Sequence, residues 1–393
     1  METSETINKA DQVIAKTYKR FPIVITKGKE ATLWDSEGRS YTDFVAGIAV
    51  CNLGHAHPDI ARALSDQAKK LLHVSNLYYT SPQTELASLL VEKSFADRVF
   101  FCNSGAEANE AAIKLARKYF NDKKEEKRYT IITMEKSFHG RTMATLSATG
   151  QDKIKAGFDP RLEGFEFIPF NNVDALQKKI NSSTCAVLIE PIQGEGGVRC
   201  PDPEYFQKVR KICDKTGTLL IFDEIQTGIG RTGKLFAYEN YGIEPDIMTL
   251  AKALANGLPI GAMLAKEEIA EAFGPGTHAS TFGGTPIVTA ASLEVLKTIS
   301  KEKIIDHALN MGKYFIKQLN YLKEKHASVE DVRGIGLLLG MKINADGDLI
   351  VKKCMEKGFL INCIQGNILR FIPPLIIKEK EIDALISCLD NIL

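Results

Sequence analysis

The sequence lacks an excess of charge of either sign. It contains 50 basic and 49 acidic side chains among 393 residues, which gives a formal net charge of +1 at pH 7. A protein that binds nucleic acid or an anionic membrane surface usually presents a basic field. The near balance of charges argues against both kinds of partner and favours small neutral or acidic molecules.

Long apolar runs and paired cysteines are also missing. No apolar stretch approaches the roughly 18 residues that a membrane-spanning helix needs, and the polar start METSETINKADQ lacks the pattern of a secretory signal or a transit peptide. The eight cysteines are scattered singly, without a C-x-x-C pair that would indicate a zinc or redox site. We therefore expect a cytoplasmic protein without a metal site.

The segment GHAH contains two histidines, His55 and His57, and histidine is a common metal ligand. We expect no acidic or cysteine side chain to act as a partner near them. We therefore interpret this segment as a loop and not as a metal site.

Short apolar runs alternate with helical patterns from about residue 97 onward. The patterns EANEAAIKLARKYF and PEYFQKVRKICDKTG are typical of amphipathic helices, and they separate the strand-like runs DRVFFCN, YTIITM, CAVLIEP, TLLIFDE and DIMTL. Continuous apolar strands separated by helices indicate a mostly parallel sheet that is covered on both faces. The sequence therefore predicts an α/β fold.

The pattern changes to long helices after THASTFGGTP. We predict a large domain of residues 51–284 and a small α+β domain of residues 285–393. Residues 1–50 are expected to pack with the small domain. Within them, ATLWDSEGRSYTDF predicts a hairpin that turns at Ser36 to Gly38.

Lys252 interrupts the apolar segment IMTLAKALANGLPIGAML. Lysine is almost never fully buried unless it is paired, and an unpaired buried ammonium group costs several kcal/mol. Burial also lowers the lysine pKa from about 10.4, which makes the amine a nucleophile that forms Schiff bases. A purely structural role for Lys252 is therefore costly.

Two further segments place polar groups at predicted strand ends. Asp223 follows the run LLIF, and the carboxyl ends of strands are where open α/β sheets bind ligands; the alternative role is a helix N-cap. Ser104 and Gly105 precede an alanine-rich helix, whose free backbone N–H groups favour a phosphate, although a Ser-Gly turn is also an ordinary N-cap. A phosphate cradle, an acid and a lysine are the groups that a pyridoxal phosphate enzyme requires.

Six segments, in chain order, resemble the class III aminotransferases of the acetylornithine aminotransferase group: NSGAEANEAAIKLAR, FHGRT, EPIQGEGG, DEIQTGIGRTG, LAKALANGLPIGA and THASTFGG. The resemblance runs from WDSEGRSYTDFVAGIAVCNLGHAHP to LRFIPPL and covers nearly the whole chain. It implies pyridoxal phosphate fold type I and a homodimer with shared active sites. It also implies pyridoxal 5'-phosphate as the cofactor, N-acetylornithine and 2-oxoglutarate as the substrates, and a role in arginine biosynthesis.

The resemblance implies a role for each matching residue toward the cofactor. Lys252 matches the lysine that is joined to the cofactor, and Asp223 matches the acid that keeps the ring nitrogen protonated. The other matching positions are the phosphate cradle Ser104, Gly105 and Ala106, the stacked ring of Phe138, Gln226 near the phenolic oxygen, and Thr281, which reaches the phosphate from the neighbouring subunit.

Four residues match positions that contact the substrates. Arg141 resembles the arginine that holds the α-carboxylate, a task that suits a guanidinium group with two parallel donors. Ser280 matches a position that contacts acetylornithine. Glu195 and Arg370 resemble a pair that is closed in one half-reaction and open in the other.

Several alternatives remain open at this point. The nearest are ornithine, succinylornithine and 4-aminobutyrate aminotransferases and lysine-pathway enzymes with carrier-bound substrates, and a more distant one is a lysine-dependent aminomutase on the same fold. A nucleotide-binding module is disfavoured because QGEGG and GIGRTG lack the spacing of nucleotide motifs. The choice of substrate depends on pocket shape, to which we expect loops around residues 18–23 and 74–80 to contribute.

Overall fold

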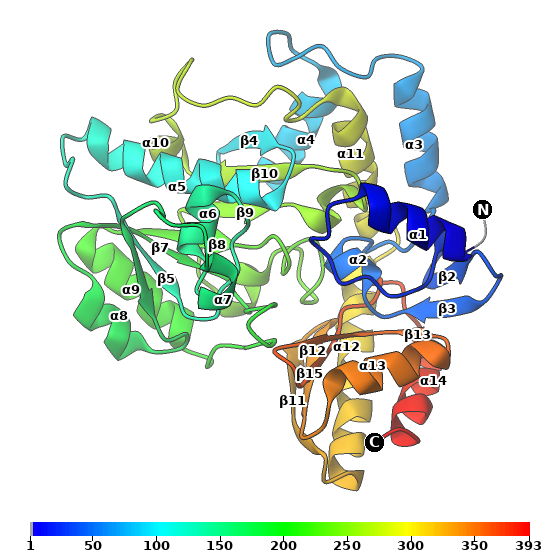
Figure 1. Cartoon of the computed structure of the whole chain (residues 1–393). Helices are drawn as coiled ribbons and strands as arrows, with labels where there is room; N and C mark the ends of the chain where they lie inside the picture. Colours follow the sequence, from blue (N-terminus) through cyan, green and yellow to red (C-terminus); the bar gives the residue numbers. More distant parts are fainter. Residues whose placement is uncertain (1–2) are drawn as a thin grey trace.

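A seven-stranded sheet forms the centre of the larger part of the molecule (Figure 1). The structure is a computed structural model that describes residues 3–393. Its strand order is β4-β10-β9-β8-β7-β5-β6, and β10 runs antiparallel to both of its neighbours. The predicted mixed, mostly parallel sheet is confirmed. The strands are β4 (Arg98–Cys102), β5 (Thr130–Met134), β6 (Phe165–Ile168), β7 (Thr184–Ile189), β8 (Leu219–Asp223), β9 (Ile247–Leu250) and β10 (Gly261–Ala265).

Helices cover both faces of this sheet, as the side chains of β8 demonstrate. Successive residues of a strand point to opposite faces. Phe222 belongs to a cluster with Phe206 of α9 (Tyr205–Thr216), whereas Ile221 belongs to another cluster with Ala112 of α5 (Gly105–Asp122). The strand is therefore buried on both faces, which explains its continuous apolar sequence.

The other helices of this part of the chain surround the sheet and its loops. They are α2 (Ala46–Ala49), α3 (Pro58–Ala68), α4 (Ser81–Glu92), α6 (Met143–Ala148), α7 (Asp152–Lys155), α8 (Val173–Lys179), α10 (Glu267–Ala270) and the short 3-10 helices η1 (Ala237–Tyr241) and η2 (Lys252–Ala255). The long helix α11 (Pro286–Lys301) packs against α3 and α4 and leads into the C-terminal part (Figure 1).

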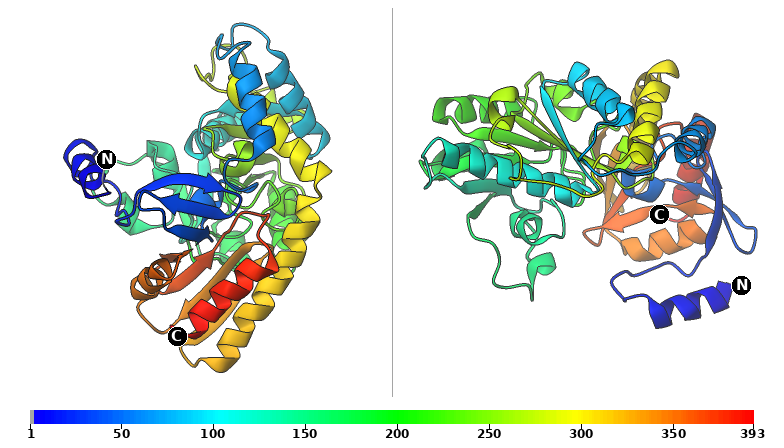
Figure 2. Two further views of the ribbon diagram at one scale, coloured as in Figure 1. Left: turned by 90° about the vertical axis from the view of Figure 1, so that its right-hand side faces the viewer. Right: turned by 90° about the horizontal axis from the view of Figure 1, so that it is seen from above.

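The C-terminal part contains an antiparallel sheet of order β11-β12-β15-β14. Helix α12 packs against β11 and β12 and against α14. Figure 2 shows these two helices side by side. The elements are α12 (Ile304–Lys325), β11 (Val329–Ile335), β12 (Leu338–Ile343), α13 (Gly347–Glu356), β13 (Phe359–Leu360), β14 (Asn362–Ile364), β15 (Ile368–Phe371) and α14 (Glu379–Asp390).

The N-terminal strands form a separate four-stranded sheet with β13. The strands are β1 (Ile25–Lys29), β2 (Thr32–Asp35) and β3 (Ser40–Asp43), and they follow helix α1 (Thr3–Val13). Strands β2 and β3 pair antiparallel, which confirms the predicted hairpin, and β3 pairs parallel with β13. The N-terminal strands therefore join the C-terminal part, while the exact division into three regions stays a prediction. Within residues 3–393 no helix combines the length and apolar character needed to cross a membrane.

The expectation that His55 has no acidic partner was wrong. Its Nε2 atom lies 2.7 Å from Oδ2 of Asp43, and the other carboxylate oxygen of Asp43 accepts backbone N–H groups of the following turn. The hydrogen bond to Asp43, with a further contribution from the Cys51 thiol, raises the pKa of His55 to about 9, although burial opposes this shift. The motif therefore anchors a loop to the end of β3.

We predict that His55→Gln changes the pH dependence of stability. Because the folded-state pKa is raised from 6.5, the charged pair stabilises the fold fully below about pH 6.5 and this stabilisation is lost as the pH rises through about 9. One pKa unit corresponds to about 1.4 kcal/mol. Solvent screening reduces this effect for a partly exposed pair, so urea unfolding should show wild type more stable than the variant by about 2 kcal/mol near pH 6 and by much less near pH 10.

A matched control for this measurement is His307→Gln. The ring of His307 contacts a main-chain carbonyl, that of Ile377. A difference between wild type and His55→Gln that stays constant over this pH range would contradict the assignment of the ion pair.

Candidate active site

A cavity of about 440 Å³ opens at the carboxyl ends of β4, β7, β8 and β9. Each of these strands delivers residues to the cavity wall at its last residue or shortly after it. This is the edge at which open α/β sheets bind ligands. Most residues predicted for the site line this cavity: Ser104, Gly105, Ala106, Phe138, Arg141, Glu195, Asp223, Gln226 and Lys252.

Three predicted residues lie outside the cavity lining. Arg370 contacts the cavity residue Glu195, and the hydroxyl of Ser280 accepts a hydrogen bond of 3.2 Å from Asn103 at the cavity edge. Thr281 is exposed and does not line the cavity of its own chain. The roles of all predicted residues stay predictions, but the fold brings most of the side chains to one place.

Lys252 opens the short helix η2, two residues after β9 ends. Its backbone has φ of 43°, in the left-handed region that costs energy for a residue with a side chain. Burial lowers the pKa of its amine, while Glu195 and Asp223 oppose this shift. The amine is therefore easier to deprotonate than that of a solvent-exposed lysine.

Asp223 ends β8 and is held by a buried hydrogen-bond network. Its Oδ2 atom accepts hydrogen bonds from Asn109 at 2.8 Å and from Nδ1 of His139 at 2.7 Å. Thr249 in turn donates to the side-chain oxygen of Asn109 at 2.8 Å. The two donors converge on this one oxygen and fix the orientation of the carboxyl group. A carboxyl group held in this way can partner a basic ring nitrogen.

Two of these supporting residues were missed by the sequence analysis. His139 lies inside the FHGRT segment, between Phe138 and Arg141, and Asn109 is completely buried on the alanine-rich helix α5. A polar amide on the apolar face of a helix needs a buried partner. An asparagine at an apolar position of a predicted helix was therefore the sequence signal that could have identified Asn109.

Glu190 is a third acid in the cavity and was also not predicted. It follows β7 directly and accepts the backbone N–H of Phe138 at 3.1 Å and that of Gly194 at 3.3 Å. Burial, with a contribution from Asp223, raises the pKa of Glu190 well above its usual value despite these donors. The carboxyl group therefore holds its proton more readily than a solvent-exposed glutamate.

The start of α5 forms one end of the cavity. Ser104 is the N-cap, and its hydroxyl accepts the backbone N–H of Glu107 at 3.2 Å. The N-cap interpretation and the phosphate interpretation of this turn are compatible, because the first N–H groups of a helix have no partner within the helix. Gly105 and Ala106 line the cavity. A phosphate at this helix end would be favoured by the helix dipole.

Glu195 and Arg370 form an ion pair beside the cavity. The Nη1 atom of Arg370 lies 2.5 Å from Oε1 of Glu195, and the Arg370 side chain on β15 is almost completely buried. Burial opposes ionisation of Glu195, but Arg370 and Lys252 lower its pKa below the usual value. The pair is therefore charged, and Arg370 is a buried cation that another carboxylate can recruit only if Glu195 moves.

Arg141 and Phe138 also line the cavity. The Arg141 guanidinium carbon lies 5.7 Å from the centre of the Phe138 ring. The Arg141 side chain is exposed, and the ion pairs of residues 3–393 do not include it. Its donors are therefore available to a ligand carboxylate.

Residues 13–393 match the family described as Aminotransferase class-III. The chain belongs to the class III aminotransferases. It is 53% identical over 378 residues to the acetylornithine aminotransferase of Caldanaerobacter subterraneus, with 96% of each chain covered. It is 50% identical over 375 residues to that of Methanocaldococcus jannaschii, with 95% of this chain and 94% of the other covered.

Solved structures with the same fold include aminotransferases of more than one substrate class. The ornithine aminotransferase of Toxoplasma gondii superposes with a TM-score of 0.96 at 34% identity. The match covers 100% of this chain and 94% of the Toxoplasma chain. The acetylornithine aminotransferase of Elizabethkingia anophelis has a TM-score of 0.90 at 34% identity, with 100% and 98% covered. These neighbours confirm the predicted α/β fold of type I.

Class III aminotransferases use pyridoxal phosphate, and a second Toxoplasma gondii structure describes this cofactor at its active site. The residues that line the cavity of this chain are chemically suited to bind pyridoxal phosphate. The N-terminus of α5 suits a phosphate, Asp223 suits a protonated ring nitrogen, and the Lys252 amine has the reactivity that a covalent bond to an aldehyde requires.

Proposed function

We propose that this aminotransferase transfers the terminal amine of N-acetylornithine to 2-oxoglutarate, giving N-acetylglutamate 5-semialdehyde and glutamate, a step of arginine biosynthesis. The observation that carries the proposal is the convergence of Lys252, Asp223, Arg141 and the Glu195–Arg370 pair on one cavity. Curated relatives at about 50% identity over nearly the full chain support the choice of substrate.

Lys252 would act as the base of the reaction. Because burial lowers its pKa, the free amine can take the proton from the carbon that bears the substrate amine, and it would deliver this proton to the cofactor carbon that receives the amine. Proton transfer by a positioned group is typically worth about 10²–10⁴-fold in rate. When bound, pyridoxal phosphate supplies an electron sink for the charge that develops at that carbon.

Asp223 and Phe138 would hold the cofactor ring in place. The network of Asn109 and His139 fixes the Asp223 carboxylate, so that it can keep a proton on the ring nitrogen. Phe138 offers an aromatic face, and such offset pairs are worth about 0.5–1.5 kcal/mol beyond the area that they bury. Gln226, at the cavity wall, is assigned to the phenolic oxygen.

Arg141 and Arg370 would divide the recognition of carboxylates. Arg141 is exposed at the cavity and free to bind the α-carboxylate of either substrate. Arg370 is covered by Glu195, which suits the half-reaction of the amine donor. Rotation of Glu195 away would free Arg370 for the second carboxylate of 2-oxoglutarate.

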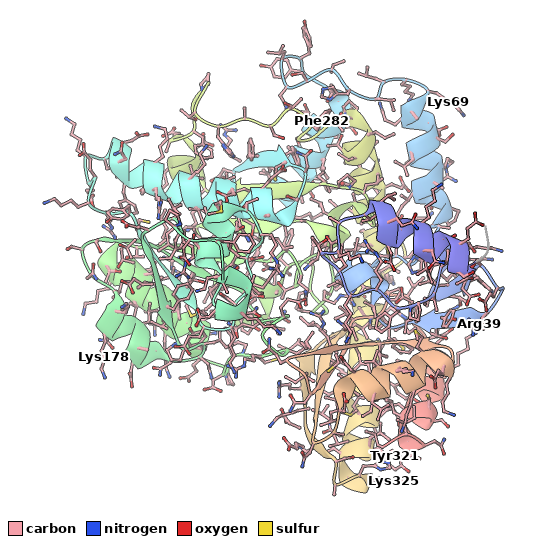
Figure 3. All side chains as sticks on the ribbon, in the orientation of Figure 1. Arg39, Lys69, Lys178, Phe282, Tyr321 and Lys325 are labelled. Carbon is pink, nitrogen blue, oxygen red and sulfur yellow. The ribbon has the colours of Figure 1, made fainter. Side chains whose placement is uncertain are left out.

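We also propose a homodimer in which Thr281 and Ser280 take part in a shared active site. The loop before α4 carries Leu77 at 82% and Tyr79 at 100% exposure, and such apolar groups mark interaction sites. Asn76 of the same loop donates to the carbonyl of Ser280 at 3.0 Å, so this apolar loop adjoins Thr281. Phe282, labelled in Figure 3, is exposed on the same side of the molecule.

A cytoplasmic location is part of the proposal. All eight cysteines of the described structure are free thiols. Disulfide bonds are rare in the cytosol because its thiols are kept reduced. The free thiols support this location over an oxidising compartment.

The first test is a steady-state comparison of amine donors with the purified holoenzyme. We expect kcat/KM to be highest for N-acetylornithine, compared with ornithine, N-succinylornithine and 4-aminobutyrate. Lys252→Ala should lower kcat by at least about 10³-fold and change the visible absorption of the bound cofactor, whereas the surface variant Lys178→Ala should do neither. Preference for ornithine would replace the proposed substrate, and turnover without 2-oxoglutarate would indicate an aminomutase.

Glu195→Gln is expected to affect the two half-reactions unequally. Without the carboxylate, Arg370 is no longer masked, so the reaction of the amine donor should slow more than the reaction of 2-oxoglutarate. Single-turnover measurement of each half-reaction gives the ratio, with the exposed α13 variant Glu356→Gln as the control. Equal effects on both halves would exclude the masking role.

The pair of substitutions Leu77→Glu and Tyr79→Glu should convert the dimer to a monomer, because each places a charge in the proposed contact. Sedimentation velocity should give twice the mass of the chain for wild type and a single mass for the double variant. Tyr321→Glu, at the opposite end of the molecule (Figure 3), should leave the dimer intact. A wild-type monomer would refute the shared site.

A further inference from the structure

A second cavity of about 620 Å³ lies behind the loop that carries Glu195, between the large sheet and the C-terminal sheet. Four basic side chains line it, and its lining contains no aspartate or glutamate among the residues that the structure describes. Lys136 and Arg199 come from loops of the large sheet, and Arg333 and Lys342 come from β11 and β12. We call it the basic cavity.

Within residues 3–393, two of these four cations form an ion pair with an acidic side chain. Arg333 lies 2.6 Å from Asp331 and Lys342 lies 2.5 Å from Glu330, and neither acid lines the cavity. The ion pairs within residues 3–393 include neither Lys136 nor Arg199. The cavity therefore has a local excess of positive charge in a chain whose formal net charge is only +1.

Neutral hydrogen-bond donors complete the wall. The amides of Asn171, Gln365 and Asn367 line the cavity beside the four cations. A cation cluster with amide donors matches the acceptor oxygens of a carboxylate or a phosphate. The walls of a concave site also concentrate the field of one charge sign.

We propose that the basic cavity binds a small anion with more than one negative charge, of the polycarboxylate or phosphate type. The anion lies between Lys136 and Arg199 on one wall and Arg333 and Lys342 on the other. It therefore bridges the large sheet and the C-terminal sheet. This site is separate from the carboxylate-binding groups Arg141 and Arg370 of the catalytic cavity.

The basic cavity is connected to the catalytic cavity by direct hydrogen bonds. Gln365 donates to the main-chain carbonyl of Glu195 at 2.9 Å, and Arg333 donates to the carbonyls of Gly197 at 2.6 Å and Val198 at 3.0 Å. An anion that recruits Gln365 or Arg333 competes with these bonds. On the proposed function, occupancy of the basic cavity therefore changes how firmly the Glu195 loop is held.

The proposal is tested by isothermal titration of the holoenzyme with citrate and, separately, with inorganic phosphate at constant ionic strength. The holoenzyme is used because the cofactor phosphate then occupies the start of α5. We expect one site per chain that persists when Arg141 is replaced by glutamine. The double variant Lys136→Gln and Arg199→Gln should weaken binding by about tenfold or more. Each substitution removes a charged hydrogen-bond donor, and hydrogen bonds to charged groups are stronger than those between neutral groups.

Two control variants separate this site from other sources of anion binding. Lys178→Gln removes an exposed cation of α8 that does not line the basic cavity (Figure 3), and this variant should bind the probes as wild type does. Arg141→Gln removes the carboxylate-binding guanidinium of the catalytic cavity, so the binding that persists in this variant belongs to the basic cavity. Tighter binding of citrate identifies a carboxylate ligand, and tighter binding of phosphate identifies a phosphate ligand.

Three results would overturn the proposal: no binding of either probe, loss of binding in Arg141→Gln, or equal weakening by Lys178→Gln and by the double variant. Unchanged thermal melting of the double variant would show that the loss is not caused by unfolding. None of these readouts depends on the amine donor, so failure of this proposal and failure of the proposed reaction are distinguishable.

Discussion

The register of three neighbouring parallel strands determines where the ionisable groups of the active site lie. Ile189, the last residue of β7, pairs with Phe222 of β8, and Asp223 pairs with Thr249 of β9. Glu190, Asp223 and Lys252 therefore leave the sheet at the same edge. A slip of one residue would exchange the two buried faces of a strand. The packing of apolar side chains on both faces sets the register of the strands, and the register sets the positions of these three polar side chains.

The cost of placing three acids at one apolar edge is offset differently for each of them. Asp223 has donors from Asn109 and His139, and Glu195 has the cation Arg370. Glu190 has two main-chain donors, is part of no ion pair within residues 3–393, and has a pKa that burial raises. The nearby Asp223 raises this pKa further, so Glu190 holds its proton more readily than a solvent-exposed glutamate. This tendency reduces the repulsion between neighbouring acids.

The sequence could predict the fold class and the central site because those features depend on local pattern. The alternation of buried strands and helices indicates the sheet, and Asp223 and Lys252 stand out because each charged side chain follows an apolar strand. The hairpin of β2 and β3 is likewise local. These features need only a few consecutive residues to be recognised.

Other features depend on contacts between distant segments and could not be predicted from pattern. Glu195 and Arg370 are 175 positions apart, and only the resemblance to a family joined them. Asn109 and Asp223 are 114 positions apart, and the partner of His55 lies on a strand that precedes it. The oligomeric state and the division into domains depend on surfaces whose partners a single sequence does not specify.

Hydrogen bonds hold the main chain of the loop that carries Glu195, and they limit how the Glu195–Arg370 ion pair can separate. Gln365 and Arg333 hold the main chain of this loop, and a side chain in place of Gly196 would lie 2.7 Å from the carbonyl of Lys136. Arg370 belongs to the same C-terminal sheet as Arg333. A shift of that sheet would carry both the loop and Arg370 along. Separation of the pair therefore requires rotation of the Glu195 side chain about a held main chain.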